Sequence, residues 1–213
     1  MNAGGLIVGL GNPGPRYEHT RHNIGFLAVD AVLALAATRK SMRLDMVKRT
    51  PDFDLWSFCP VGAQKGTFLL AKPQTFMNLS GRAVSSICAS HGLSPEQVLV
   101  LHDELDLPLG RMKLKQGGGA NGHNGISSIE EELVSPAFFR LRLGIGRPTA
   151  PVGAPEGTFP GSVTDYVLGD FAPEEMELVR QVLPAAWKGL DLFYRRGQAM
   201  AVQFVNAFRP EEA

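Results

Sequence analysis

Cysteine is scarce in this chain of 213 residues, which has Cys59 and Cys88 but no C-x-x-C pair and no other metal-ligand spacing. Isolated cysteines of this kind are typical of reduced thiols in a cytoplasmic protein, so we expect no disulfide framework. Long apolar runs are also missing. The N-terminal run 6–10 is about one strand long and has no basic flank, which fits neither a signal peptide nor a membrane span. We therefore expect a cytoplasmic protein that does not contact membranes.

The chain has no excess of either charge, because 21 lysines and arginines balance 21 aspartates and glutamates. This balance argues against a histone-like protein that is basic over its whole surface, although a local basic patch is sufficient to bind nucleic acid. Such a patch is possible in the stretch 111–129, which contains no acid, and in FRLRLGIGRP. The basic side chains of these two stretches are Arg111, Lys113, Lys115, Arg140, Arg142 and Arg147. A solvated charged face is the other interpretation of these residues.

Internal repeats and low-complexity tracts are absent from the sequence, and short apolar runs alternate with helical patterns. This alternation predicts a single α/β domain over residues 1–213. Strands are expected at 6–10, 53–59, 67–71, 98–102, 111–115 and 139–145. Helices are expected at 22–37 and 80–90, after Asn124, and at the helix-start signature LSPEQV. The stretch 148–172 is expected to be a loop or lid flank, and 173–208 to be helices interrupted at Pro184 and Gly197.

Glycines 9, 11 and 14 lie at the end of the first apolar run and just beyond it. They have the G-x-G-x-x-G spacing of a dinucleotide-binding turn. Such a turn needs an acid at a strand end about twenty residues on, to hold the ribose. Here the acid near that distance is Asp30, in the middle of a predicted helix. Two prolines in the segment also remove backbone donors that would bind phosphate. We therefore expect the glycines to form a tight turn that displays polar side chains, and we expect no cofactor.

Four segments place polar side chains after apolar strands or before helices. They are GNPGPRYEHTRHN, FMNLSG, HDELDLPLG and GGGANGHNG, with Asn12, Tyr17, His22, Met77, Asn78, His102, Asp103, Asp106, Asn121, His123 and Asn124 among them. A histidine is the best general base near neutral pH, and a carboxylate behind it fixes its tautomer. Asparagine amides suit the binding of a carbonyl or an oxyanion. With no G-x-S-x-G serine and no cysteine in these segments, the simplest mechanism is a water activated by histidine, which suits an activated ester.

These residues leave alternatives open. His102 and His123 are possible bases in place of His22, although each is more often a structural histidine. A metal-dependent phosphodiesterase that uses Asp103, Glu104 and Asp106 is a further hypothesis, for which chelators would be inhibitory. The glycines 117–119 indicate a tight or flexible loop and not a mononucleotide site, since the P-loop lysine and serine do not follow them.

The four segments, in this order and at these separations, resemble the bacterial peptidyl-tRNA hydrolase family. The resemblance is strong through about Gly146 and thinner over the C-terminal third, where the stretch 148–162 looks longer and richer in proline than in the family. It implies a single α/β domain with a mixed twisted β-sheet flanked by helices. It also implies hydrolysis of the ester between a peptide and the 3′-terminal ribose of tRNA, which recycles the tRNA, in a monomer without cofactor or metal. An RNA-binding module without significant hydrolysis is the alternative on the same scaffold.

The resemblance assigns roles to individual residues. His22 in TRHN matches the catalytic base, and Asp103 in HDELD matches the residue that holds this histidine in its basic form. Asn12 in GNPG matches the position that distinguishes N-blocked peptidyl esters from free aminoacyl esters. Asn78 and Asn124 match amides that contact the substrate.

The resemblance also assigns the contacts with tRNA. Tyr17 and Phe76 match positions near the 3′ end of the tRNA, where aromatic faces suit base stacking. Met77 is expected to form a wall of the site. The tRNA phosphates are expected to bind Arg111, Lys113, Lys115 and Arg142. Because phosphate contacts carry no sequence information, such an enzyme would accept every tRNA.

Overall fold

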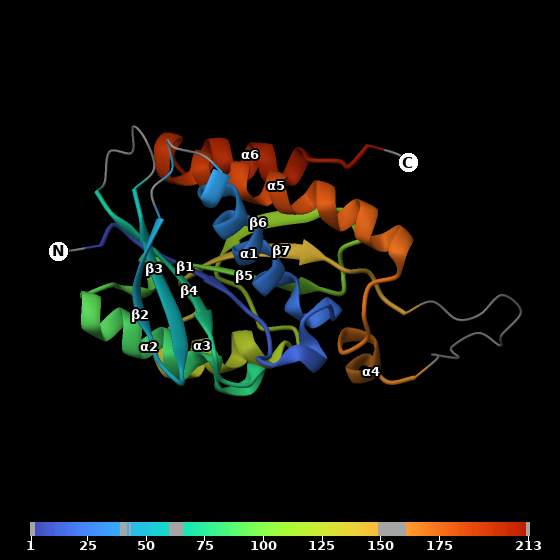
Figure 1. The fold of residues 1–213 in the computed structure, drawn as a ribbon, viewed down its shortest axis with the longest axis horizontal. Helices are drawn as coiled ribbons and strands as arrows, with labels where there is room; N and C mark the ends of the chain where they lie inside the picture. The colour runs from blue at the N-terminus through green and yellow to red at the C-terminus, as the bar shows by residue number, and fades with distance from the viewer. Residues whose placement is uncertain (1–2, 39–41, 43, 60–65, 149–160, 212–213) are drawn as a thin grey trace, which may run out of the picture.

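The chain is built around one seven-stranded sheet in the computed structural model, which describes residues 3–38, 42, 44–59, 66–148 and 161–211 (Figure 1). The strands are β1 (Leu6–Gly9), β2 (Leu44–Arg49), β3 (Phe53–Phe58), β4 (Phe68–Pro73), β5 (Val98–Glu104), β6 (Met112–Gln116) and β7 (Phe139–Gly144). Their order across the sheet is β2-β3-β4-β1-β5-β7-β6. The central strands β4, β1, β5 and β7 are parallel, and the strands toward both edges pair antiparallel. The expected mixed sheet is confirmed.

Helices cover both faces of this sheet. Those in the described residues are α1 (Ile24–Thr38), α2 (Ser80–His91), α3 (Asn124–Leu133), α4 (Val163–Val167), α5 (Pro173–Arg196) and α6 (Gln198–Ala207). Helices α1, α5 and α6 pack on one face, and α2 and α3 pack on the other. In Figure 1, α5 and α6 lie above the strands, and α2 and α3 lie below them. Among the described residues, no helix combines the length and apolar character that crossing a membrane requires.

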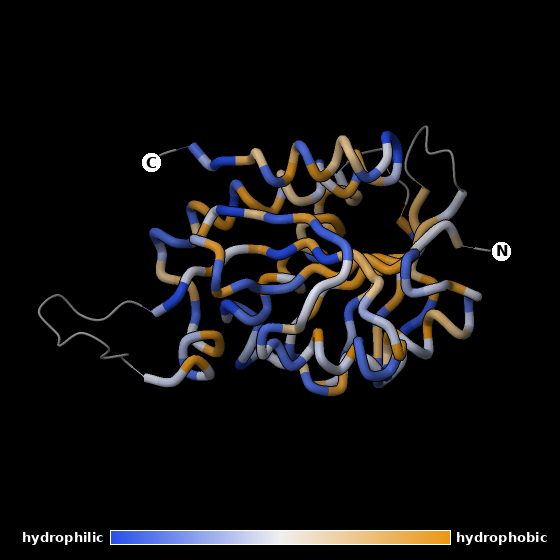
Figure 2. Tube along the Cα trace, turned by 180° about the vertical axis from the view of Figure 1, so that it is seen from behind, coloured by the Kyte–Doolittle hydropathy of each residue, from blue (hydrophilic) through white to orange (hydrophobic). Residues whose placement is uncertain are grey.

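The central strands carry long apolar runs because they are buried on both faces. In β5, Val98 and Val100 pack toward α2 and α3, whereas Leu99 and Leu101 pack toward α1, α5 and α6. Figure 2 shows apolar residues gathered along the strands and on the inner sides of the helices. The uninterrupted run VLVL therefore made β5 predictable without any period of two.

The structure differs from the sequence-based expectations at an edge strand and in a long helix. Strand β2 was not predicted; it is exposed along nearly its whole length, and a bulge between Met46 and Lys48 interrupts its alternation. Helix α5 continues through Pro184, where we expected an interruption. A proline removes one helical hydrogen bond, but Val182, Ala185 and Ala186 around it are buried in the core, and this packing keeps the helix continuous.

The remaining helix boundaries follow local chain signals. The break at Gly197 is confirmed, and this residue has a φ of 91°. The signature LSPEQV forms its capping box between Ser94 and Gln97 but supports only one 3-10 turn, because β5 begins at Val98. Helix α4 lies within the stretch 148–172 that we expected to be a loop or lid flank. Residues 149–160 of that stretch lie outside the described residues.

Two glycines at and just after the end of β1 allow a close approach to α1 and do not themselves form a turn. A Cβ on Gly9 would lie 2.3 Å from the carbonyl oxygen of Gly25, and one on Gly11 would lie 2.5 Å from the ring of Phe26. Only Gly14, with a φ of 104°, has the left-handed backbone expected of a glycine turn. The close contact brings the start of α1, and the short helix before it, against the carboxyl end of β1.

Candidate active site

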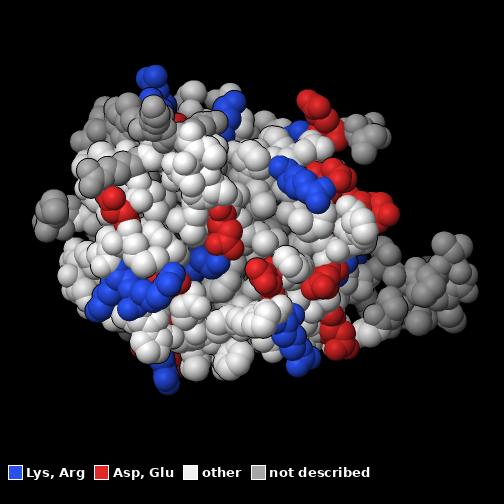
Figure 3. All heavy atoms as spheres, in the orientation of Figure 1, with Lys and Arg blue, Asp and Glu red and all other residues white. Residues whose placement is uncertain are grey.

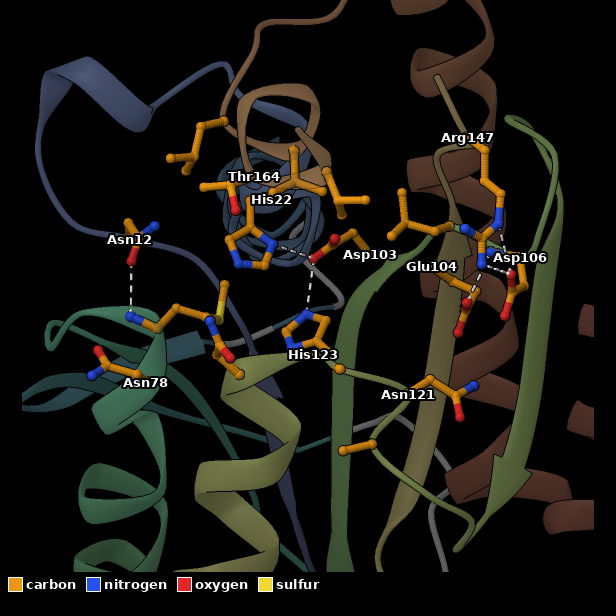
Figure 4. A pocket seen from close by; sticks show the side chains of 18 of the residues that line it. Asn12, His22, Asn78, Asp103, Glu104, Asp106, Asn121, His123, Arg147 and Thr164 are labelled. Atoms are coloured by element: carbon orange, nitrogen blue, oxygen red, sulfur yellow. Dashed lines mark hydrogen bonds and ion pairs between the residues drawn. The ribbon is translucent and has the colours of Figure 1, made fainter. Parts of the chain in front are cut away.

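A cavity of about 750 Å³ opens at the carboxyl ends of β1 and β5 (Figure 4). In an open α/β sheet this edge is the usual location of a binding site. Its polar groups include side chains from the loop after β1, the 3-10 helices Arg21–Asn23 and Met77–Leu79, the end of β5 and the N-terminus of α3. Helix α4 and Leu168 after it form a mostly apolar wall, in which Thr164 is the polar residue. Of the residues that we predicted for the site, the cavity is lined by Asn12, His22, Phe76, Met77, Asn78, Asp103 and Asn124.

His22 and Asp103 are hydrogen-bonded although 81 positions separate them in the chain. The Nδ1 of His22 lies 2.8 Å from Oδ1 of Asp103, and since an ionised carboxylate only accepts, Nδ1 carries the proton. The lone pair of the neutral ring is then on Nε2. Within the described chain no group hydrogen-bonds this Nε2, which points away from Asp103 on the side of Asn12 and Asn78 (Figure 4). This arrangement is that of a general base held by a carboxylate.

A second histidine binds the same oxygen of Asp103. The Nε2 of His123 lies 2.9 Å from Oδ1 of Asp103. Its Nδ1 accepts the backbone N–H groups of Gly125 and Ile126 at the start of α3, so the proton must be on Nε2. Asp103 therefore receives two N–H donors, and His123 has no free lone pair to act as a base. Of the histidines considered from the sequence, His22 alone combines the carboxylate contact with an open ring nitrogen.

The charge of Asp103 is stabilised by these neighbours. Burial of Asp103 opposes its ionisation, but the imidazoles of His123 and His22 outweigh this effect and hold the pKa of Asp103 far below its ordinary value. His102, the other histidine considered as a base, is 4% exposed and donates its Nδ1–H to the carbonyl oxygen of Asp103. Burial and the nearby His123 hold the pKa of His102 well below the ordinary histidine value, so its ring is neutral.

Asn12 is fixed in position on two sides. Its Oδ1 accepts the backbone N–H of Met77 at 2.8 Å, which leaves the Nδ2 donors for the cavity. Asn23 holds the backbone of Asn12 through two hydrogen bonds. Its Oδ1 accepts the N–H of Asn12 at 2.8 Å, and its Nδ2 donates to the carbonyl oxygen of Asn12 at 2.9 Å. Asn78 and Asn124 are exposed at the rim of the same cavity. Asn12, Asn78 and Asn124 thus line the cavity, whereas Asn23 supports Asn12 without lining it.

The residues predicted to contact tRNA are divided between two regions. Tyr17 and Phe76 lie together in an edge-to-face arrangement with ring centroids 6.5 Å apart, and Phe76 is 56% exposed. Lys113 and Arg142 are paired across β6 and β7 and therefore share one face of the sheet. Lys115 is two residues further along the same face of β6.

The four basic residues differ in how free their charges are. Lys113 is exposed, and Lys115 is half-buried. Arg142 is mostly buried, and its guanidinium is bound to the carboxylate of Glu104. Arg111 lies within electrostatic range of Arg209 near the C-terminus. Because the charge of Arg142 already has a partner, it is less free than the two lysines to bind a tRNA phosphate. Its contact with tRNA stays a prediction.

Comparison with known proteins identifies the family. The family model for peptidyl-tRNA hydrolase matches residues 6–213. The chain belongs to the peptidyl-tRNA hydrolase family. It is 51% identical over 206 residues to the peptidyl-tRNA hydrolase of Maridesulfovibrio salexigens, covering 97% of this chain and 95% of that protein. It is 49% identical to the corresponding protein of Nitratidesulfovibrio vulgaris (strain DSM 19637 / Miyazaki F), covering 99% of this chain and 100% of that protein.

A solved structure from the peptidyl-tRNA hydrolase family has the same fold. The crystal structure of peptidyl-tRNA hydrolase from Acinetobacter baumannii matches with a TM-score of 0.81 and 33% identity, covering 99% of this chain and 98% of that one. The family match reaches the C-terminus. The thinner resemblance that we expected over the last third of the sequence therefore does not limit the family assignment.

The carboxylates considered for a metal-dependent phosphodiesterase each bind a different partner. Asp103 binds the two histidines, Glu104 binds Arg142, and Asp106 binds Arg147. Among the described residues, the group close enough to hold a metal ion is His22, Asp103 and His123, whose ligand atoms lie within 4.8 Å of one another. Two hydrogen bonds to Asp103 join these three side chains.

Sequence reasoning missed two contacts of this site. The first is the pair of hydrogen bonds from Asn23, which stands beside His22 in TRHN and was available as a signal in that motif. The second is the hydrogen bond of His123 to Asp103. His123 was considered as a rival base. Its position just before α3 in the sequence does not reveal that one ring nitrogen caps the helix while the other binds Asp103.

Proposed function

We propose that this chain hydrolyses the ester bond between the peptide and the 3′-terminal ribose of tRNA in peptidyl-tRNA, with His22 as the general base. The observation that carries the proposal is the 2.8 Å hydrogen bond from His22 to the buried Asp103, which leaves the other ring nitrogen open beside the cavity. Membership of the peptidyl-tRNA hydrolase family supports the choice of substrate.

The reaction begins with a water molecule next to Nε2 of His22. The ring takes one proton from this water while Asp103 retains the hydrogen bond to Nδ1 and stabilises the imidazolium that forms. The hydroxide adds to the ester carbonyl, and the carbonyl oxygen becomes an oxyanion. The ester C–O bond then breaks, and the ribose oxygen leaves with the proton from His22. The products are a peptide with a free carboxyl group and a tRNA with a free ribose hydroxyl.

The amides around the cavity assist this reaction. The Nδ2 of Asn12 is free to donate because its Oδ1 is bound to the backbone of Met77. A donor held this rigidly suits the carbonyl oxygen of the acyl group that blocks the amine. A free aminoacyl ester has no such acyl group. Asn78 and Asn124 at the rim are suited to contact the substrate or the developing oxyanion.

The tRNA is held outside the cavity. Tyr17 and Phe76 offer aromatic faces to the bases of the single-stranded 3′ end. Lys113 and Lys115 offer charges to phosphates, which would make binding independent of the tRNA sequence. The enzyme acts as a monomer in the cytoplasm and recycles tRNA from peptidyl-tRNAs that leave the ribosome prematurely.

The test compares N-acetyl-aminoacyl-tRNA with unblocked aminoacyl-tRNA in the presence of EDTA, and follows the loss of the ester. Rapid cleavage of the blocked substrate alone is expected, and it would support both a metal-free reaction and the role of Asn12. The control is His22→Ala, which should lower kcat by about 10² to 10⁴ and leave tRNA binding unchanged. If the wild-type chain binds tRNA without cleaving either substrate, the alternative of an RNA-binding module is correct.

A further inference from the structure

The segment 163–171, which we call the α4 strap, joins the wall of the cavity to the turn that carries His22. Val163, Thr164, Val167 and Leu168 of the strap line the cavity. Beyond them, the strap runs antiparallel to the turn. The N–H of Arg21 donates to the carbonyl of Gly169 at 3.0 Å, and Thr20 and Asp170 form a β-bridge. The residue next to the catalytic base is therefore in direct contact with the strap.

The side chain of Arg21 makes this contact stronger than the backbone alone would. Its guanidinium lies over the ring of Tyr166, 4.5 Å from the centroid, and 5.5 Å from the centroid of Phe171. Its Nη2 lies 2.6 Å from Oε2 of Glu175, and its Nη1 lies 3.4 Å from the carbonyl oxygen of Tyr166. The side chain is 13% exposed. Desolvation of this degree makes both the cation–π contacts and the charged hydrogen bond stronger than at the surface.

The partners of Arg21 are themselves anchored to the rest of the fold. The same oxygen of Glu175 accepts the N–H of Ala172 at 2.7 Å and so caps the start of α5. The hydroxyl of Tyr166 donates to the carbonyl of Ile145, just after β7, at 2.6 Å. One guanidinium thus connects the turn of His22, the strap and the N-terminus of α5.

We propose that Arg21 is a positioning residue for the reaction, because its guanidinium holds the α4 strap against the turn of His22 and so fixes the cavity wall. The proposal rests on the proposed function. Arg21 does not touch His22 or Asp103, and the strap supplies wall residues and not reacting groups. Loss of Arg21 contacts therefore acts on substrate binding more than on the chemical step.

The test is Arg21→Lys, which keeps the charge near Glu175 but loses the planar group that stacks on Tyr166. The KM for N-acetyl-aminoacyl-tRNA should rise about tenfold, which corresponds to the loss of a desolvated cation–π contact. The kcat and its pH profile should stay close to those of the wild type. Amide hydrogen exchange over residues 166–171 should become faster, whereas exchange in β5 should not change.

Two substitutions on α5 give a matched comparison. Glu175→Gln keeps an acceptor for the N–H of Ala172 but removes the charge that pairs with Arg21, so KM should rise in the same direction by a smaller factor. Glu177→Gln removes the charge of an exposed pair with Arg180 on the same helix, and neither KM nor exchange in the strap should change.

Three results would overturn the proposal. One is an Arg21→Lys variant with unchanged KM and unchanged exchange in the strap. Another is a loss of kcat with a shifted pH profile, which would mean that Arg21 acts on the His22–Asp103 pair directly. The third is faster exchange in β5 as well, which would indicate a general loss of stability. Since the exchange measurement needs no turnover, it tests the strap contact even if the wild-type chain cleaves no ester.

Discussion

At the scale of single residues, Asp103 is the centre of the site because one of its oxygens accepts N–H groups from both His22 and His123. Asp103→Asn keeps an oxygen that can accept both donors but removes the charge that stabilises the imidazolium. We expect kcat to fall by about 10²- to 10⁴-fold and the midpoint of its pH profile to move to lower pH. The measurement is single-turnover ester cleavage from pH 5 to 9.

The same pair predicts non-additive losses. If His22 and Asp103 act as one unit, as proposed, the double variant His22→Ala/Asp103→Asn should be no slower than His22→Ala alone. Losses that multiply in the double variant, or a pH profile that Asp103→Asn leaves in place, would contradict the proposed pair.

His102 predicts a pH dependence of stability that is separate from catalysis. Its pKa in the folded state is depressed by burial and by His123, so above about pH 6.5 the ring is neutral in both the folded and the unfolded chain. As the pH falls below this value, the unfolded chain binds a proton that the folded chain does not. The free energy of unfolding then decreases by about 1.4 kcal/mol per pH unit.

This prediction is tested with His102→Asn, which keeps a donor for the carbonyl of Asp103 but cannot be protonated. Urea unfolding at pH 7, 6 and 5 should give a shallower loss of stability in the variant than in the wild type. A constant offset between the two proteins reports lost packing and is not decisive. Equal slopes would mean that His102 is protonated in the folded state.

At the scale of elements, α3 begins at a residue that also belongs to the site. His123 caps the helix through Nδ1 and donates to Asp103 through Nε2. His123→Ala removes both contacts, whereas asparagine is among the best N-cap residues but is too short to replace the contact with Asp103. We expect His123→Asn to be about 1 kcal/mol more stable than His123→Ala in urea unfolding. Both variants should lose the same factor in kcat, and recovery of kcat by asparagine would mean that the cap alone matters.

The elements that the sequence predicted are those whose local pattern agrees with their packing. The run VLVL of β5 is buried on both faces, and the predicted helix 80–90 matches α2. Strand β2 was missed because its apolar residues, such as Met46 and Val47, are about half exposed and carry no core pattern. The interruption expected at Pro184 was wrong because burial of the surrounding residues outweighs the local cost of proline. Both errors arise where tertiary contacts, which sequence patterns do not contain, decide the structure.

At the scale of the whole molecule, residues that line the site and the pairing of His22 with Asp103 were predictable, but other connections of the site were not. The motifs indicated His22, Asp103 and Asn12, since each residue type has a defined chemical use. The contacts of Arg21 with Glu175 and of His123 with Asp103 join segments 154 and 20 positions apart. Which of many polar residues meet over such separations depends on strand order and helix placement, so only the folded chain reveals it.

The last prediction concerns the charge distribution of the molecule. Basic and acidic side chains are interspersed on the face in Figure 3, and blue side chains gather over β2 and β3. Lys113 lies in β6, and Lys48 lies in β2 at the opposite edge of the sheet. If Lys113 contacts a tRNA phosphate, Lys113→Ala should weaken binding of every tRNA alike. It should also reduce the slope of log Kd against log salt concentration by about 0.7 to 0.9.

A variant at the opposite edge of the sheet decides whether the tRNA lies at β6. Lys48→Ala removes another exposed charge, at β2, and should leave the slope unchanged, as measured by filter binding from 50 to 200 mM salt, roughly the range over which phosphate contacts are resolved. Arg142→Ala should instead lower stability by about 3 to 5 kcal/mol, because it leaves the carboxylate of Glu104 buried without its partner. A reduced slope in Lys48→Ala and an unchanged slope in Lys113→Ala would place the tRNA phosphates on the β2 edge.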